Sequence, residues 1–307
     1  MKHTMHVTAI LIAVFLFIQI FGLYALSRTM DVTTGEDGTV SVGYSDTAVG
    51  ERPEIEGIWS LLYILTGILI GTALIMLFVR LGQVKLWKVM YFLALWLAST
   101  ITLGVFTGAA IAMVAAAIIS VLELFRTNVF IHNLTEILIY PGIAILFAPL
   151  FSIEWAVVLL IAISIYDMYA VWKSGHMVKL AKFQTKSRAF AGFVIPYSTG
   201  KDKGLSAIKA RMPKGTKEGG IRTAILGGGD IAFPLIFAGV CMEWFVVSGV
   251  PMALALMQAS VVSAFAALFL LILFVRAEKD KFYPAMPFVT AGCFIGLGVV
   301  LALGALF

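Results

Sequence analysis

Nine long runs of apolar residues dominate this sequence and limit what the chain can fold into. They lie at roughly 5–27, 57–79, 89–106, 108–125, 134–151, 153–172, 221–247, 251–275 and 284–306. A helix that crosses the hydrocarbon of a bilayer needs about 20 apolar residues, so the runs are long enough, or nearly so, to span a membrane. Only 13% of the 307 residues are charged, against about 25% in soluble proteins. We therefore predict an all-α polytopic membrane protein with nine transmembrane helices.

The first run follows Lys2 and has two interpretations, a cleaved signal peptide or a retained span. The apolar core of a signal peptide is typically about 7–15 residues long, and this run is longer. We expect it to remain in the mature protein as a membrane anchor.

The basic residues divide unevenly between the two sides that nine spans create. If the N terminus and every second connection share one side, that side receives all but two of the 22 Lys and Arg residues, the exceptions being Arg28 and Arg52. Because Lys and Arg accumulate on the cytoplasmic side, we predict a cytoplasmic N terminus and an outer C terminus. The net charge of +5 thus points to the membrane surface, and no nucleic-acid partner is predicted.

Two connections are long enough to have structure of their own. Residues 28–56 are acidic and rich in Gly, Thr and Ser, which suits an exposed outer loop. Residues 173–220 are basic, and we expect their first half to lie on anionic headgroups and their Gly-rich second half to be flexible. The predicted parts are a six-span bundle at 1–172, the cytoplasmic loop at 173–220 and a three-span part at 221–307.

Small residues spaced four apart predict where helices pack closely in lipid. The sequence has three such glycine pairs, which are Gly67 and Gly71, Gly104 and Gly108, and Gly292 and Gly296. The two cysteines, Cys241 and Cys293, both lie in apolar runs and cannot form a disulfide framework or a zinc site. No metal or cofactor is predicted.

Two acidic residues lie inside predicted spans. Asp167 lies in the sixth run, and Asp230 follows three glycines in the seventh. An Asp at the centre of a span costs about 2.5–3.5 kcal/mol to insert, so two of them require a compensating role. The other acids of the runs are closer to span ends, namely Glu123, Glu136, Glu154 and Glu243.

The predicted topology brings the two aspartates to similar depth. The sixth span runs inward and the seventh outward, and a rise of 1.5 Å per residue places Asp167 about 8 Å and Asp230 about 12 Å below the same face. Carboxyl groups in contact share a proton near neutral pH. The ionised one can deprotonate a water while the protonated one polarises a peptide carbonyl, as in aspartic proteases. On the acids alone, a structural pair or the proton relay of a transporter remains an alternative.

Two further segments suit a protease. The glycines at 227–229 weaken a helix and let another backbone approach, as a substrate's peptide bond must. The ninth span opens with Pro284-Ala285-Met286-Pro287, although prolines are tolerated in any first turn.

The segment before these glycines has two interpretations. Residues 221–226 alternate like a strand, or they simply begin the seventh helix. Because an unwound substrate needs partners for its backbone in lipid, we predict that this segment offers it a strand edge.

Taken in order, these motifs resemble the presenilin and signal peptide peptidase family of intramembrane aspartyl proteases. The matching motifs are Tyr-Asp at 166–167, Gly-x-Gly-Asp at 227–230 and Pro-Ala-x at 284–286, on the spans where that family carries them. The family's Pro-Ala-Leu is Pro-Ala-Met here, a volume-conserving change. The resemblance implies that Asp167 and Asp230 are catalytic. It implies supporting roles in the site for Tyr166, Gly227, Gly228, Gly229, Pro284, Ala285 and Met286.

The resemblance also implies a function. The expected enzyme is an aspartic endopeptidase that hydrolyses peptide bonds within transmembrane helices of single-span proteins or signal peptides, without metal or cofactor. Its expected partners are those substrates and the lipid bilayer, and its expected location is a prokaryotic, archaeal cell membrane. Nothing in the sequence requires accessory subunits.

Other functions have weaker support in the sequence. There is no His-Glu-x-x-His zinc motif, and Ser248 lies in Val-Val-Ser-Gly rather than in a Gly-x-Ser-Gly serine site. A proton-coupled secondary transporter is the main alternative. It predicts interrupted helices in two related halves, which we do not find.

Overall fold

The computed structural model describes most of the chain, that is, residues 5–52, 55, 57–125, 128–174, 191–198, 221–278 and 283–304. Most of the predicted basic loop, at 175–190 and 199–220, lies outside the described residues. The expected headgroup contact of its first half and the expected flexibility of its second half therefore stay predictions.

Helices account for most of the described chain. They are α1 (Met5–Ser27), α2 (Ile58–Leu81), α3 (Val84–Thr107), α4 (Ala109–Phe125), α5 (Val129–Phe147), α6 (Ile153–Tyr169), α8 (Gly228–Val247), α9 (Met252–Arg276) and α10 (Met286–Gly304). Each coincides with one of the nine apolar runs, so the predicted polytopic helical class is confirmed. Eight are long and apolar enough to cross a membrane. The exception, α4, has 17 residues, or about 26 Å of helix, and is slightly shorter than a hydrocarbon core of about 30 Å.

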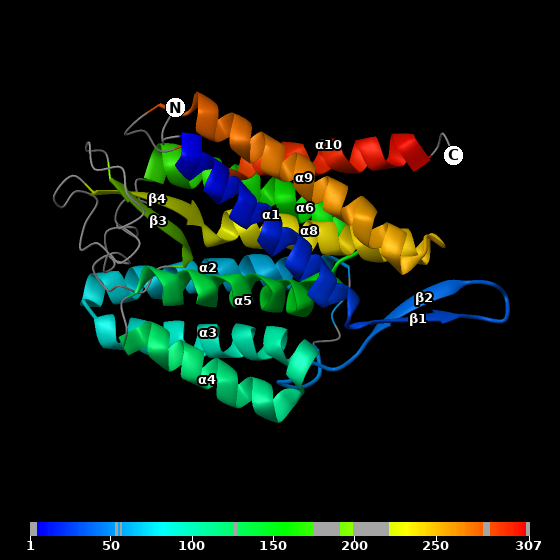
Figure 1. Cartoon of the computed structure of the whole chain (residues 1–307), viewed down its shortest axis with the longest axis horizontal. Coiled ribbons are helices and arrows are strands. Elements are labelled where there is room, and N and C mark those ends of the chain that lie inside the picture. Colours follow the sequence, from blue (N-terminus) through cyan, green and yellow to red (C-terminus); the bar gives the residue numbers. More distant parts are fainter. Residues whose placement is uncertain are drawn as a thin grey trace.

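The helices lie side by side, and their connections alternate between two ends of the bundle (Figure 1). Helix α1 begins at the end where strands β3 (Gly192–Ser198) and β4 (Ile221–Gly227) lie, whereas the hairpin of β1 (Met30–Thr34) and β2 (Val40–Tyr44) projects from the opposite end. Helix α10 finishes at that opposite end. This arrangement is the one that nine alternating crossings produce.

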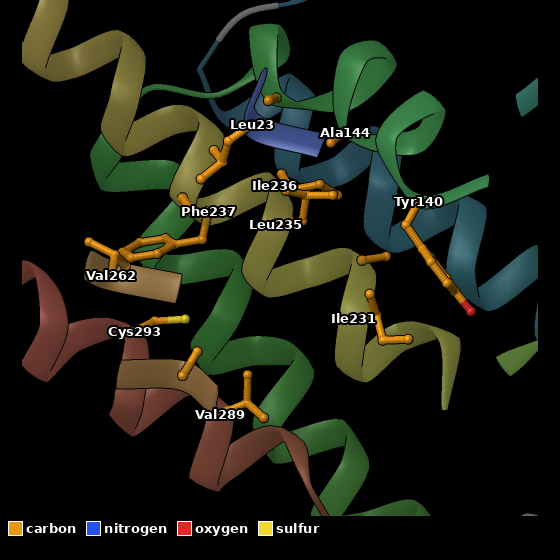
Figure 2. Packing of buried hydrophobic residues seen from close by; sticks show 14 of the residues in the cluster. Leu23, Tyr140, Ala144, Ile231, Leu235, Ile236, Phe237, Val262, Val289 and Cys293 are labelled. Carbon is orange, nitrogen blue, oxygen red and sulfur yellow. The ribbon is translucent and has the colours of Figure 1, made fainter. Parts of the chain in front are cut away.

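Helix α8 forms the centre of the bundle. Inside the protein, 72% of its apolar stretch is buried, whereas the corresponding share is 17–50% for the other candidate spans. Side chains leave it in several directions (Figure 2): Phe237 points toward Val262 of α9 and Cys293 of α10, while Leu235 and Ile236 lie on the side of α1 and α5. The ring of Phe237 also packs edge-on against Phe294, with 5.7 Å between centroids.

One of the three predicted glycine pairs makes close helix packing. A Cβ built on Gly292 lies 2.6 Å from the Phe265 carbonyl oxygen, and one built on Gly296 lies 2.8 Å from Val262 Cα. No side chain fits at either position without moving the backbone of α9. The prediction is therefore confirmed for the contact between α9 and α10.

The prediction is wrong for the other two pairs. Gly67 and Gly71 have no neighbour within 4 Å of a built Cβ. Gly104 is close to Ala48 of the outer loop and not to a helix, and Gly108 ends α3 with a φ of 82°. Glycines spaced four residues apart show only that another group can come close to the helix backbone. Which group does so is decided by the tertiary structure.

The outer loop is attached to α8 by a partly buried hydrogen bond. The hydroxyl group of Tyr44 on β2 donates to Glu243 Oε2 on α8 over 2.6 Å. The Arg52 guanidinium lies 5.3 Å from the centre of the Tyr44 ring and donates from Nε to the Ile145 carbonyl. Burial and the neighbouring Glu243 carboxylate raise the pKa of Tyr44 well above its usual value, so its hydroxyl stays a proton donor. The predicted exposed outer loop is thus an ordered hairpin.

The start of the predicted seventh span is a strand. Residues 221–227 form β4, which pairs antiparallel with β3 from Gly192↔Gly227 to Ser198↔Ile221, and α8 begins only at Gly228. Of the two interpretations left open by the sequence, the strand is confirmed and the helical one is wrong. The β-branched alternation of this segment decides its local structure because a partner strand is present.

Labelling of single cysteines tests the predicted topology. In a background with Cys241 and Cys293 replaced by alanine, Glu36→Cys at the tip of the β1–β2 hairpin should react with a membrane-impermeant maleimide added outside intact cells. Lys173→Cys at the opposite end should react only after permeabilisation. Labelling of both residues from the same side contradicts the nine-crossing arrangement, and the cysteine-free parent measures background.

Candidate active site

Asp167 lies in the last turn of α6, where the helix changes its winding. The Ala170 N–H is shared between the carbonyl groups of Asp167 and Tyr166, and residues Ala170–Ser174 continue as a π-helical turn. Such turns are rare and frequently occur at functional sites. The Asp167 side chain is 9% exposed, whereas the neighbouring Tyr166 ring is 40% exposed.

The Pro-Ala-Met segment contacts Asp167 through its backbone. The Met286 N–H donates to Asp167 Oδ2 over 3.1 Å, and the Ala285 N–H also interacts with this carboxyl group. Pro287 has no N–H, and the Phe288 N–H is taken by the Ala285 carbonyl. The N–H groups of Ala285 and Met286, which have no partner within α10, therefore face Asp167. Free N–H groups at a helix N-terminus stabilise a nearby carboxylate.

A second contact holds α10 against α6 one turn further along. The hydroxyl groups of Ser164 and Thr290 are buried and 2.8 Å apart. Ser164 precedes Asp167 by three residues, and Thr290 follows Met286 by four, so each lies one turn from the contact at Asp167. Helices α6 and α10 are therefore joined at two successive turns, at Asp167 and at this buried hydroxyl pair.

Asp230 lies in the first turn of α8, immediately after the strand. Gly227 is the N-cap of the helix in an extended conformation, and its N–H interacts with the Asp230 carboxyl group. A Cβ built on Gly227 lies 3.0 Å from Asp230 Oδ2, which is closer than an ordinary van der Waals contact. Glycine at this position therefore allows the carboxyl group to fold back on the N-cap.

The structure brings Asp167 and Asp230 together. Helices α6, α8 and α10 pack against one another, and the two carboxyl groups are close enough to interact electrostatically. The expected depth of Asp230 inside a helix that starts near Arg222 is wrong, because that helix starts at Gly228. Asp167 instead lies in the last turn of α6, and Asp230 lies in the first turn of α8, directly after β4.

A large apolar cavity reaches the glycines next to Asp230. Its volume is about 1260 Å³, and residues of α2, α3, α5 and α8 line it. Gly67 and Gly71 of α2 lie on one wall, and Gly228 and Gly229 lie at the active-site end. A Cβ built on Gly228 lies 3.1 Å from the Tyr140 hydroxyl oxygen, so a side chain at Gly228 would crowd Tyr140.

A buried polar cluster between α4 and α5 was not predicted from the sequence. Glu123 and Glu136, which we expected near span ends, and His132 are all at most 5% exposed. His132 Nδ1 lies 2.8 Å from Glu123 Oε1, and Tyr140 donates a short hydrogen bond to Glu136. The spacing of His132, Glu136 and Tyr140 on one face of an apolar run was the signal that could have identified the cluster.

One protein family matches most of the chain. The model of the family described as "Signal-peptide peptidase, presenilin aspartyl protease" matches residues 39–305. The chain belongs to this family. Its members are intramembrane aspartic endopeptidases, and the eight apolar helices accordingly make this enzyme an integral, multi-pass membrane protein.

Two solved structures have a similar fold. Both are of a presenilin family intramembrane aspartate protease, in space groups C222 and P2, and their TM-scores are 0.57 and 0.60. Each is 16% identical in sequence, and each alignment covers 95% of this chain and 96% of the other. No curated protein sequence gives a significant match.

Removal of the Ser164–Thr290 hydrogen bond should lower both the stability and the activity of this aspartyl protease. Thr290→Val keeps the shape of the side chain but leaves the buried Ser164 hydroxyl without its partner, which costs about 1–3 kcal/mol. We expect a lower unfolding temperature and slower cleavage of a single-span substrate.

Ser260→Ala is the matched control, because the Ser260 hydroxyl donates to Leu256 of its own helix over 2.7 Å. Equal loss of activity in both variants would show that the contact between α6 and α10 has no special role.

Proposed function

We propose that Asp167 and Asp230 hydrolyse peptide bonds within the transmembrane helices of single-span membrane proteins or of signal peptides. The observation that carries this proposal is the convergence of the two carboxyl groups, from α6 and α8, in a chain of the aspartyl protease family. In the proposed mechanism the pair shares one proton. The ionised carboxyl deprotonates a water, and the protonated one polarises the scissile carbonyl.

The chain's other residues have proposed roles that follow from their contacts. The N–H groups of Ala285 and Met286 interact with the Asp167 carboxyl group and hold it in one orientation. Pro284 sets the entry of the chain into this segment. Gly227 permits the contact with Asp230, and Gly228 and Gly229 line the cavity next to Asp230. Tyr166, which directly precedes Asp167 and is partly exposed, is proposed to support the site from α6.

We propose the apolar cavity as the place where the substrate helix docks. Its walls are apolar and come from α2, α3, α5 and α8, and its end lies at Gly228 and Gly229, directly before Asp230. A transmembrane helix carries apolar side chains all round, so it suits a cavity of this composition. The open space at Gly67 and Gly71 gives its backbone room beside α2.

We propose that the unwound part of the substrate pairs with the outer edge of β4. The sheet has two strands, in the order β3–β4, among the described residues, so this edge has no strand beside it there. Ala224 and Leu226 are buried, whereas Ile225 is 40% exposed. An unwound peptide in an apolar environment needs backbone partners, and a strand edge supplies them in β-augmentation.

The membrane itself is part of the proposal. An archaeal cell membrane is the location that the family resemblance suggested, and the cleaved substrates are its proposed protein partners. The basic loop and the N terminus are proposed to be cytoplasmic.

Substitution of either aspartate tests the catalytic pair. Asp167→Asn and Asp230→Asn should each reduce cleavage of a single-span substrate in detergent by at least about 10²-fold, the scale of general acid–base catalysis. The double variant should be no worse than either single one, because the two act as a unit. The parent's pH–rate profile should be bell-shaped, and an aspartic-protease transition-state analogue should inhibit it. Analogue-sensitive cleavage by a single variant would overturn the assignment.

Proline substitution tests the strand edge. Thr223→Pro removes one backbone N–H from β4 and should slow cleavage about tenfold or more relative to Thr223→Ala, given the rate penalty of a misplaced substrate. Binding of the transition-state analogue to both variants shows whether the catalytic pair is intact. Equal cleavage rates for the two variants and the parent would exclude substrate pairing at this position.

A further inference from the structure

The side chains of α5 bind the edge of β3 that faces away from β4. The Gly192 N–H donates to Glu136 Oε2 over 2.9 Å, and His132 Nε2 lies 2.8 Å from the Gly192 carbonyl oxygen. Two residues along the strand, the Val194 N–H donates to Asn133 Oδ1 over 3.0 Å, and Asn133 Nδ2 donates to the Val194 carbonyl over 2.8 Å. Both peptide groups of both residues are thus taken by side chains.

These contacts copy the pattern of a strand. In an antiparallel sheet, alternate residues direct both N–H and C=O to the same edge. Gly192 and Val194 are such alternate residues, and the next one, Pro196, has no N–H. We name His132, Asn133, Glu136 and Tyr140 the α5 polar face. Its first three members occupy the place of a third strand.

The same alternation identifies the groups that stay available on β4. Gly192 pairs with Gly227, Val194 with Ile225 and Pro196 with Thr223. Since the peptide groups of Gly192 and Val194 point away from β4, those of Gly227 and Ile225 point away from β3. The interaction of the Gly227 N–H with Asp230 agrees with this direction.

Each member of the α5 polar face that binds Gly192 has a second partner. Because the Gly192 carbonyl can only accept, His132 Nε2 carries a hydrogen, and its Nδ1 meets Glu123 of α4. Glu136 also accepts from Tyr140, whose hydroxyl adjoins Gly228 at the start of α8. These buried hydrogen bonds join α4, α5 and β3, and the Tyr140 hydroxyl brings the cluster into contact with the start of α8, near Asp230.

Gly192 is suited to this position by its backbone. Its φ is 147°, a value that residues with a Cβ rarely adopt. The strand can therefore begin there and still direct both of its peptide groups toward α5.

We propose that the α5 polar face is a positioning device that closes the outer edge of β3, so that a substrate strand can pair only with β4. An unpaired strand edge attracts any extended segment, and a sheet with two open edges would admit a substrate on the side away from Asp230. By holding β3, the α5 polar face also sets where β4, and hence the bound substrate, lies relative to Asp167 and Asp230. This inference rests on the proposed protease function.

The test compares variants of α5 in the full-length protein. Asn133→Leu is nearly isosteric and removes both bonds to Val194, and Asn133→Ser can replace at most one of them. Thr135→Val is the matched control, because the Thr135 hydroxyl is buried and donates within its own helix to the Ile131 carbonyl over 2.8 Å. Each is assayed with one single-span substrate for kcat, KM and the cleaved bonds, the last by mass spectrometry.

We expect Asn133→Leu to lower kcat about 10- to 100-fold, the scale for misplaced reactants, while KM changes less than about twofold because the helix cavity is intact. Its products should also spread over neighbouring peptide bonds, and Asn133→Ser should be intermediate. Hydrogen exchange of the β3 amides should accelerate in both Asn133 variants and not in Thr135→Val.

Other outcomes separate the two proposals. If the parent cleaves at one bond, and Asn133→Leu cleaves that same bond with unchanged kcat, the positioning role is wrong and the protease function stands. Loss of activity in Asn133→Leu without a change in cleaved bonds or in β3 exchange would also overturn it. If the parent itself does not cleave, the proposed function fails first. A poorly folded Asn133→Leu leaves Asn133→Ser to decide, by the same shift in cleaved bonds and exchange.

Discussion

Peptide groups that leave a helix in an apolar environment need partners from elsewhere in the protein, because lipid supplies none. The active site is assembled where helices begin or end and such groups become free. At the start of α10, the N–H groups of Ala285 and Met286 face Asp167. Before α8, the chain is a strand whose inner edge pairs with β3. At the outer edge of β3, side chains of α5 take both groups of Gly192 and Val194. Such free groups thus contact Asp167, a candidate catalytic residue, and hold the sheet that leads to Asp230, the other candidate.

Helix α8 carries this arrangement because it is held on several sides. Against α1 the packing is reciprocal: Gly22 accommodates Leu235, and Gly239 accommodates Leu26, with built Cβ atoms 2.5 Å from leucine methyl carbons in both cases. Gln19 of α1 adds a buried hydrogen bond of 2.9 Å to the Ile231 carbonyl, next to Asp230. The first apolar run, for which both a signal peptide and a retained span were considered, therefore packs against the helix that bears Asp230. Rigid support of this kind keeps a site preorganised.

Some predictions were wrong because apolar residues or spaced glycines do not by themselves specify a helix or a contact between helices. Residues 221–227 are apolar enough to extend the seventh span, yet they form a strand because β3 is there to pair with them. Glycine spacing predicted the contact at Gly292 and Gly296 but not the empty space at Gly67 and Gly71. Glu123 and Glu136, which the sequence placed closer to span ends, are buried because α4, α5 and β3 pack around them.

The sequence by itself determined the membrane-protein class, the nine helices, the alternation of their ends and the identity of the two candidate catalytic aspartates. These follow from local properties: the length of apolar runs, the distribution of basic residues and the high energy of an acid within a span. Only the tertiary structure decided that Asp167 meets the backbone of Met286, that Asp230 lies at the start of its helix, and that α5 binds β3. Those contacts join residues far apart in the chain through peptide groups, and a peptide group is the same at every position. The side-chain sequence therefore does not reveal which backbone peptide groups will be free to make these contacts.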